Sequence, residues 1–237
     1  MKRTTDIGEL ILQRVTREKF VLFSYWSVCH DQRMSTRKKN PVATRATILR
    51  HAGEEFCRMG FQAARLNAIV ENSGITKGAL FHHFAGKDDL CLQWLQETLP
   101  ALLESTWLAP LRAGEDNPLA TIHSILREQV RVIEQTPRRE FTGNPLATLT
   151  SSIPIEDCPL QKAMTELMQQ WHQSISEALR KGQSRKTVHA AIQASDEAHL
   201  IIALMTGLEL QARSGGSGIA AGFLRAAGAY LETLRPA

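Results

Sequence analysis

The chain has 237 residues, of which 43% are hydrophobic and 22% charged, and its formal net charge is +4. Its four cysteines form no Cys-x-x-Cys pair, which argues against a disulfide framework and favours a reducing, cytoplasmic location. Apolar runs are shorter than a membrane span, and the stretch 20–29 lacks a signal-peptide cleavage site, so we expect no membrane association. Apolar residues recur at helical spacing, which predicts an all-α fold.

The first 33 residues fit poorly with the rest of the chain. Met34 is followed by the polar, basic stretch STRKKNP. Two explanations are open: 1–33 is a non-native or disordered upstream extension and Met34 is the true start, or a genuine extra helix spans about 7–23. We favour the first. An intact mass that includes residue 2 would exclude it.

The apolar pattern predicts helices in chain order over about 42–59, 65–72, 76–84, 87–103, 118–136, a short segment after Pro145, 159–182, 195–213 and 218–234. Gly60 is expected to end the first helix, because glycine readily takes the backbone conformation of a helix stop. Gly86 precedes the fourth helix, whose first turn carries Asp88 and Asp89. Carboxylates in this position interact favourably with the positive end of the helix dipole.

A tight turn is predicted at Ser73-Gly74, between the second and third helices. The hydroxyl of Thr76 is expected to cap the next helix by accepting from a backbone N–H near Ala79. Ile75 precedes this cap and Leu80 is the fourth helical residue, a spacing typical of a hydrophobic staple. Two short helices with such a turn can place the second in a DNA major groove, which is about 12 Å wide.

The segment GFQAARLNAIVENSGITKGALFHHFAGKDDL, residues 60–90, resembles the helix-turn-helix of the TetR/AcrR family of transcriptional regulators, and the resemblance covers about 50 residues. It implies a three-helix DNA-binding domain over 34–90 and a helical ligand-binding and dimerisation domain over 91–237. Charge agrees with this division: 34–90 hold nine Lys and Arg against five Asp and Glu, whereas 91–237 hold thirteen against fifteen. A basic excess suits phosphate contact.

The resemblance implies roles for the matching residues. Thr76 would contact phosphate through its hydroxyl and the helix N-terminus, and Lys77 would reach phosphate or a base edge. Gly78 would let the backbone approach DNA closely. His82 would face the groove, and Lys87 would hold a backbone phosphate.

Departures from the family pattern change other roles. Phe81 stands where the family usually has a phosphate-binding tyrosine, so it is expected to touch sugar or a thymine methyl. Ala64-Arg65 stands where the family usually has a residue pair that contains a hydroxyl. The usual cap of the second helix is therefore missing, and Arg65 is expected to contact phosphate instead. Arg45, near the start of the first helix, is another phosphate candidate.

The C-terminal half resembles the family less closely. Segments 143–149 and 179–183 are similar to a subgroup that includes electrophile- and drug-responsive repressors. An effector pocket is predicted to be lined by Trp107, His123, Leu126, Leu146, Trp171 and Ile175. The last two helices, 195–234, are apolar or rich in small residues and are the predicted homodimer seam, which would suit a near-palindromic operator.

The function these observations predict is a dimeric repressor that a small-molecule effector releases from double-stranded DNA. An enzyme is disfavoured, since no catalytic or nucleotide-binding motif is visible, and a regulator that responds only to a protein partner and an activator both stay open. No cofactor is expected. No metal is expected either, because His82, His83 and Cys91 lack a third ligand at helical spacing. Cys57 and Cys91 are expected to pack as small apolar residues, and Cys158 to be an inert loop thiol.

Overall fold

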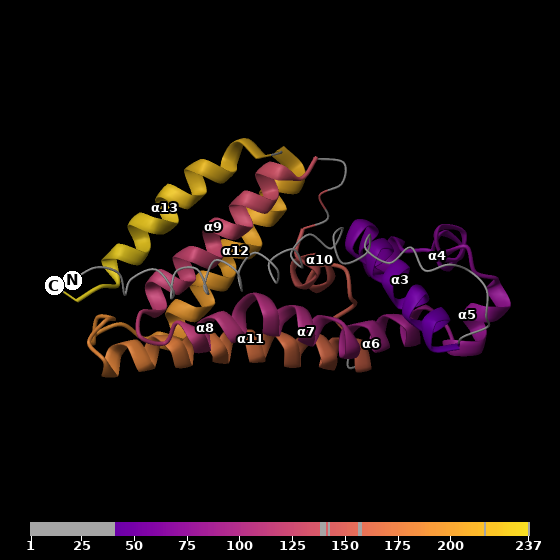
Figure 1. Ribbon diagram of the computed structural model, residues 1–237, viewed down its shortest axis with the longest axis horizontal. Helices are drawn as coiled ribbons and strands as arrows, with labels where there is room; N and C mark the ends of the chain where they lie inside the picture. The colour runs from indigo at the N-terminus through magenta and orange to yellow at the C-terminus, as the bar shows by residue number, and fades with distance from the viewer. Residues whose placement is uncertain (1–40, 138–140, 142, 156–157, 216, 237) are drawn as a thin grey trace, which may run out of the picture.

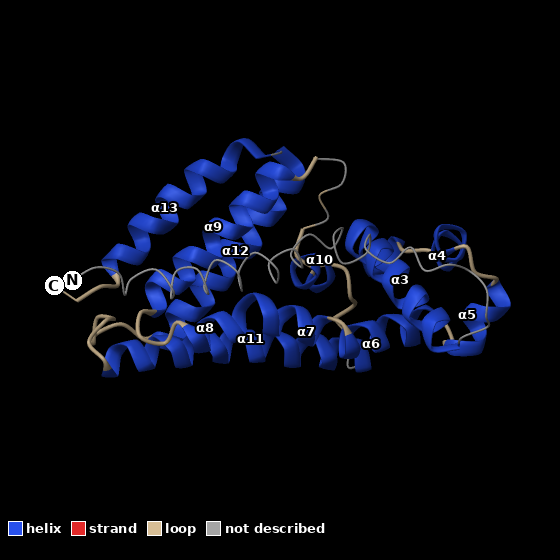
Figure 2. Ribbon diagram, in the orientation of Figure 1, coloured by secondary structure: helices blue, strands red, loops and turns tan. Residues whose placement is uncertain are grey.

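The computed structural model describes residues 41–137, 141, 143–155, 158–215 and 217–236 (Figure 1). Every regular element in this part of the chain is helical, which confirms the predicted all-α fold (Figure 2). The proposed extension 1–33, its alternative helix and the basic stretch 34–40 lie outside the described residues.

A three-helix unit forms one end of the elongated molecule and consists of α3 (Pro41–Ala63), α4 (Leu66–Ser73) and α5 (Lys77–His83) (Figure 1). Its core consists of side chains that are fully buried: Ile48, Ala52, Phe56, Ile69 and Leu80. Gly60 interrupts α3 with a φ of 73° and ψ of 166°. The predicted stop at Gly60 is therefore a break in the helix, after which the chain turns helical again as far as Ala63.

A nearly continuous helical rod leaves this unit: α6 (Lys87–Glu97), α7 (Leu99–Leu103), the π-helical turn η2 (Glu104–Leu108) and α8 (Ala109–Ala113). The predicted end near residue 103 was wrong by about ten residues. Pro100 and Pro110 fall in the first turns of α7 and α8, where a helix needs no backbone N–H, so neither proline ends the rod.

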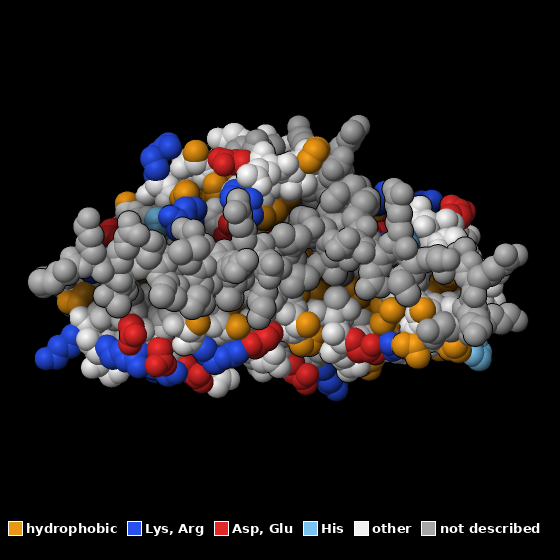
Figure 3. Space-filling view, in the orientation of Figure 1, with side chains coloured by type: hydrophobic (Ala, Val, Ile, Leu, Met, Phe, Trp, Pro, Cys, Tyr) orange, Lys and Arg blue, Asp and Glu red, His pale blue; other side chains and the backbone are white. Residues whose placement is uncertain are grey.

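The C-terminal bundle consists of α9 (Pro118–Gln135), α10 (Pro145–Thr150), α11 (Pro159–Ser184), α12 (Ala194–Gly215), the 3-10 turn η3 (Ser217–Ile219) and α13 (Ala220–Thr233). α11 packs between the rod and α12, and α13 packs along α9. Figure 3 shows acidic and basic side chains mixed along the lower edge, over α11. Within the described ranges, no helix combines the length and apolarity that a bilayer crossing requires.

Candidate nucleic-acid interface

α5 lies at the end of the molecule that is farthest from the C-terminus (Figure 1). Its N-cap is Thr76, whose hydroxyl oxygen accepts from the Ala79 N–H at 3.2 Å, so the predicted cap is confirmed. The turn before it contains Gly74 with a φ of 67°, as predicted. Leu80 is fully buried and Ile75 packs against the same core, as the predicted staple requires.

One face of this short helix is open to solvent. The predicted DNA-contacting residues of this region are all exposed: Thr76, Lys77, Gly78, Phe81 and His82. A β-carbon added to Gly78 would meet no atom of the protein within 4 Å, so internal packing does not explain a glycine there. Phe81 is 45% exposed, and the Lys77 ammonium lies 5.9 Å from its ring centroid. The structure therefore brings these five residues together on one accessible surface.

Arg45 is engaged within the protein. Its guanidinium donates to both carboxylate oxygens of Glu97, at 2.6 and 2.5 Å, and also to Gln93, and it lies 5.3 Å from the Phe84 ring centroid. The hydrogen bond from Arg45 lowers the pKa of the Glu97 carboxyl. These contacts tie α3 to α6, and the predicted role of Arg45 at a phosphate would require it to leave them.

Lys87 is also held by the protein. Its ammonium donates to the carbonyls of Phe61 at 3.0 Å and Gln62 at 3.1 Å and lies 4.7 Å from the Phe61 ring centroid. Carbonyls at the end of a helix attract a cation, so Lys87 caps the end of α3. The phosphate contact expected from the family resemblance competes with this cap and stays a prediction.

Arg65 is exposed and makes no side-chain cap at the start of α4, as predicted. Its backbone N–H donates to Glu55 at 3.3 Å, and Glu55 is only 3% exposed and pairs with Arg58. Sequence reasoning missed Glu55. Its position seven residues after the buried Ile48, on the apolar face of α3, was the available signal for a carboxylate with an internal partner.

The positive charge of the interface is smaller in the described part than over 34–90. Residues 41–90 hold six Lys and Arg against five Asp and Glu, because Arg37, Lys38 and Lys39 lie outside the described residues. Among the six, Arg45 and Lys87 have the internal partners given above. Lys77 is exposed on α5 itself.

The six residues predicted to line an effector pocket lie in the C-terminal half. Five of them are at most 5% exposed and belong to the core: Trp107, Leu126, Leu146, Trp171 and Ile175. His123 is half-buried against Gly228 of α13. The rings of Trp107 and Trp171 lie 5.2 Å apart between centroids, and each indole N–H is buried with no hydrogen-bond partner among the described residues. These two donors and the His123 ring are the polar groups of the predicted site.

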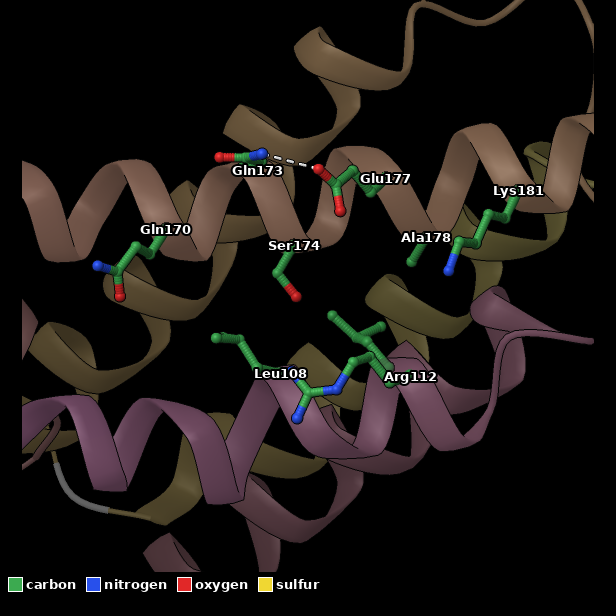
Figure 4. A pocket seen from close by; sticks show the side chains of 9 residues that line it. Leu108, Arg112, Gln170, Gln173, Ser174, Glu177, Ala178 and Lys181 are labelled. Atoms are coloured by element: carbon green, nitrogen blue, oxygen red, sulfur yellow. Dashed lines mark hydrogen bonds between the residues drawn. The ribbon is translucent and has the colours of Figure 1, made fainter.

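A separate cleft of about 250 Å³ lies between α8 and α11 (Figure 4). Leu108 and Ser174 point toward the gap between the two helices, Arg112 lies along its own helix, and Gln173 donates to Glu177. Arg112 is paired with Glu104. None of the six predicted pocket residues lines this cleft, so their assignment as an effector site stays a prediction.

The thiols differ in exposure. Cys57 and Cys91 are buried, and burial raises the pKa of the Cys91 thiol to about 12, so this thiol stays protonated and unreactive near neutral pH. Their predicted packing in the core is confirmed. Cys158 is half-buried before α11.

Comparison with known proteins adds sequence and fold relationships. Residues 48–93 match the family model described as bacterial regulatory proteins, tetR family. The chain is 32% identical over 104 residues to the HTH-type transcriptional regulator RutR of Escherichia coli K12, an alignment that spans 43% of this chain and 47% of RutR. The chain therefore matches about half the length of this relative.

Solved structures share the fold over most of the chain. A TetR family transcriptional regulator from Agrobacterium tumefaciens superposes with a TM-score of 0.72 and 20% identity, over 83% of this chain and 100% of that one. The TetR family regulator CifR, solved with 26-base-pair operator DNA, superposes with a TM-score of 0.67 and 20% identity. The match covers 84% of this chain and 98% of the CifR chain. RutR and these solved structures are all named as transcriptional regulators. Residues 48–93 thus match the DNA-binding domain of the tetR family, and most of the chain shares its fold with solved TetR family regulators.

Proposed function

We propose that this chain is a dimeric repressor that binds a near-palindromic operator in double-stranded DNA and leaves it when a small-molecule effector binds the C-terminal bundle. The exposed face of α5, with five contact candidates on a capped helix, carries the proposal. α5 is the second helix of the helix-turn-helix, and its outer face is exposed among the described residues, so it can enter the major groove.

Each residue on the exposed face of α5 is suited to a different contact with DNA. Lys77 supplies charge for phosphate or a base edge, and Gly78 leaves room for the DNA backbone. Phe81 presents an apolar ring suited to a sugar or a thymine methyl, and His82 a hydrogen-bond donor. Arg65, at the start of α4, is exposed and supplies a further phosphate contact.

Dimerisation through α12 and α13 follows from the side chains that their packing within the chain leaves uncovered. Ile201, Met205 and Leu208 are buried in the chain's own core, whereas Leu200 and Leu210 are 44% and 46% exposed. On α13 the exposed residues include a group of small ones: Ala221, Gly222, Ala226 and Ala229. A second copy would cover this surface and set two α5 helices at half-sites about one turn of DNA apart.

The effector would enter the bundle between Trp107 and Trp171. Two buried indole donors without partners cost free energy in the free protein, and a ligand with hydrogen-bond acceptors and a planar apolar body would satisfy both. The packed core around them means that binding has to displace side chains, which is the kind of differential interaction that shifts a population between two conformations.

The test is selection of binding sites from random double-stranded DNA by the purified full chain, followed by affinity and footprint measurements. A near-palindromic site with two protected half-sites and a dimeric complex is expected. Lys77→Met should weaken binding and lower the salt dependence of log K by about one phosphate contact, a slope change of about 0.9. Selection of no site, or a footprint of one half-site by a monomer, would contradict the proposal.

The effector arm uses tryptophan fluorescence. Compounds that release the selected DNA should quench Trp107 or Trp171, and the Trp107→Phe, Trp171→Phe double variant should bind the same DNA but no longer respond. Arg112→Gln, in the cleft between α8 and α11, is the matched control, and loss of the response there instead would move the effector site to that cleft.

A further inference from the structure

The segment around Gly143 and Asn144, part of the sequence stretch that resembles a family subgroup, is built against α12. Gly143 has a φ of 73°, and a side chain there would approach Arg213 at 3.5 Å and Glu209 at 3.8 Å. The Asn144 N–H donates to Glu209 at 2.5 Å, and the Asn144 side chain caps α10 by accepting from the Leu146 N–H at 2.8 Å. These contacts fix the start of α10 on the C-terminal part of α12.

Arg213 extends this contact to the three-helix unit. Its guanidinium donates to the Thr148 hydroxyl of α10 at 2.6 Å, to the Cys57 carbonyl at 3.4 Å and to the Arg58 carbonyl at 3.2 Å. One side chain from α12 therefore bonds both α10 and the end of the first part of α3. Figure 1 shows α10 lying between α3 and α12.

A second contact lies beyond the break in α3. The Phe61 N–H donates to the Ser152 hydroxyl at 2.9 Å, so a side chain two residues after α10 caps the resumed helix. A β-carbon on Gly60 would lie 3.0 Å from that of Ser152, so the two backbones can approach this closely only with glycine at position 60. Arg213 and Ser152 thus bond the α3 backbone on the two sides of Gly60.

We propose that these residues form an interdomain joint, made of Arg213, Thr148, Ser152 and the α3 backbone around Gly60, that positions the three-helix unit for DNA, with Arg213 as its central positioning residue. The inference rests on the proposed DNA-binding function. Arg45 with Glu97 holds α3 to the rod, and the joint holds α3 to α10 and α12. Attached both to the rod and to α10 and α12, the three-helix unit has a fixed orientation. Attached to the rod alone, it can change its orientation, and part of the free energy of DNA binding is then spent on ordering it.

Glu209 is buried next to Arg213 at the joint. The carboxyl is fully enclosed, and burial raises its pKa to about 8, so it is largely protonated near neutral pH. A neutral carboxyl can accept from the Asn144 N–H without burying a negative charge, so Glu209 fixes the start of α10 on α12 next to Arg213.

The test compares Arg213→Met with Arg127→Met, in the full chain, on a double-stranded site selected from random DNA by the wild type. Arg127 is an exposed arginine of α9 whose side chain, among the described residues, bonds Ser124 on its own helix, so Arg127→Met removes the same charge without touching the joint. Arg213→Met should bind roughly tenfold more weakly, within the usual range for coupling between sites, with an unchanged salt slope. Arg127→Met should stay close to wild type.

Two further variants separate positioning from folding. Thr148→Val should weaken binding roughly threefold, and the double variant should be no weaker than Arg213→Met, because both changes remove the same bond. Arg213→Lys, which keeps a cationic donor, should recover part of the affinity. A general folding defect would instead add the two losses and would not be rescued by lysine.

Amide hydrogen exchange gives a readout that needs no DNA. Arg213→Met should speed exchange over 60–64, while exchange in α11 stays as in wild type. Unchanged affinity together with unchanged exchange would overturn the joint. If the wild type selects no DNA, the proposed function fails, but faster exchange over 60–64 in Arg213→Met would still establish the joint, so the two failures are distinguishable.

Discussion

The three-helix unit and the C-terminal bundle treat their polar groups differently. In the unit, the polar groups that support its shape have partners inside the protein: Glu55 accepts from Arg65, and Thr76 caps α5. In the bundle, four buried polar side chains have no partner among the described residues: Trp107, Gln129, Trp171 and Ser176. The named polar groups of the three-helix unit are hydrogen-bonded within the protein, whereas the bundle contains buried polar groups without hydrogen-bond partners among the described residues.

Under the proposed function, this difference suits the two regions to different roles. A buried polar group without a partner costs about 1–3 kcal/mol, so the bundle holds free energy that a suitable ligand can recover. The three-helix unit has no such reserve among the groups described above and acts as a rigid support for α5. Recognition of DNA needs a fixed surface, whereas response to an effector needs a core that can exchange contacts.

Lys87→Met is expected to have the largest effect on the unit. It removes a cation from the Phe61 and Gln62 carbonyls and leaves the end of α3 without its cap. The free energy of unfolding should fall by about 1.5–3 kcal/mol, as for hydrogen bonds to a charged group. Denaturant unfolding of the free protein measures this.

Lys77→Met is the matched control, because Lys77 is exposed on α5 and its ammonium lies over Phe81. It should leave the free energy of unfolding within about 0.5 kcal/mol of wild type while weakening DNA binding. If Lys87→Met left stability unchanged and weakened only DNA binding, Lys87 would be a phosphate contact and its cap on α3 unimportant.

Glu209→Gln tests the bundle side of the comparison. The pKa of Glu209 is raised to about 8 from an ordinary value near 4.5, so between these pH values the folded protein holds a proton that the unfolded chain has released. Wild-type stability should therefore fall as pH rises from 4.5 to 8. Glutamine does not titrate, so the variant should match wild type near pH 5 and exceed it by about 4 kcal/mol near pH 9, at about 1.36 kcal/mol for each unit of pKa shift.

Glu115→Gln serves as a control of opposite sign. Hydrogen bonds from Arg185 and Lys181 lower the pKa of the exposed Glu115 carboxyl, so its charged form is favoured by folding. Glutamine there should cost a little stability at neutral pH rather than add any at high pH. A wild-type curve that stays flat between pH 5 and 9, and parallel to that of Glu209→Gln, would show that Glu209 is ionised in the folded protein.

Local signals in the sequence were enough for the three-helix unit. Gly74, Thr76 and Leu80 each act within one turn of the chain, so the turn, the cap and the buried core could be predicted from spacing alone. The partners of Arg45 and Lys87 could not, since Glu97 is 52 residues from Arg45 and the Phe61 carbonyl is 26 residues from Lys87. A basic residue near a helix start has the same local pattern whether it binds phosphate or its own protein.

The bundle was predictable as helices but not as a site. Trp107 and Trp171 were singled out as aromatic residues on apolar faces, and their contact depends on how η2 packs against α11. Arg213 was missed altogether, because its bonds to Cys57 and Arg58 join positions about 155 residues apart. Only Gly143-Asn144 gave a local signal, a turn followed by a helix cap before Pro145.

Thr76→Ala is expected to cost the free protein about 1 kcal/mol, the usual value for loss of a helix N-cap. The hydroxyl that accepts from Ala79 would be absent, and the Ala79 N–H would depend on water. Thermal or denaturant unfolding measures the change. Thr76→Ser keeps the hydroxyl and should stay near wild type, and equal losses in the two variants would mean that the threonine methyl, not the cap, stabilises α5.

Gly78→Ala gives the smallest effect on stability and the clearest contrast with DNA binding. Gly78 lies within α5 with helical backbone and open space where a β-carbon would be, so alanine should raise the free energy of unfolding by up to about 1 kcal/mol. If the DNA backbone approaches this residue closely, the same methyl group should weaken DNA binding. A variant that is more stable and yet a weaker binder cannot be explained by folding.

Gly74→Ala is the control for Gly78, because its φ of 67° makes alanine destabilising wherever the DNA lies. The two glycines are four residues apart in the same helix-turn-helix, and only the first is required by the fold. If Gly78→Ala bound DNA as tightly as wild type, the close approach would be wrong and recognition would rest on Lys77, Phe81 and His82. A loss of affinity with a gain in stability would place the DNA backbone against α5.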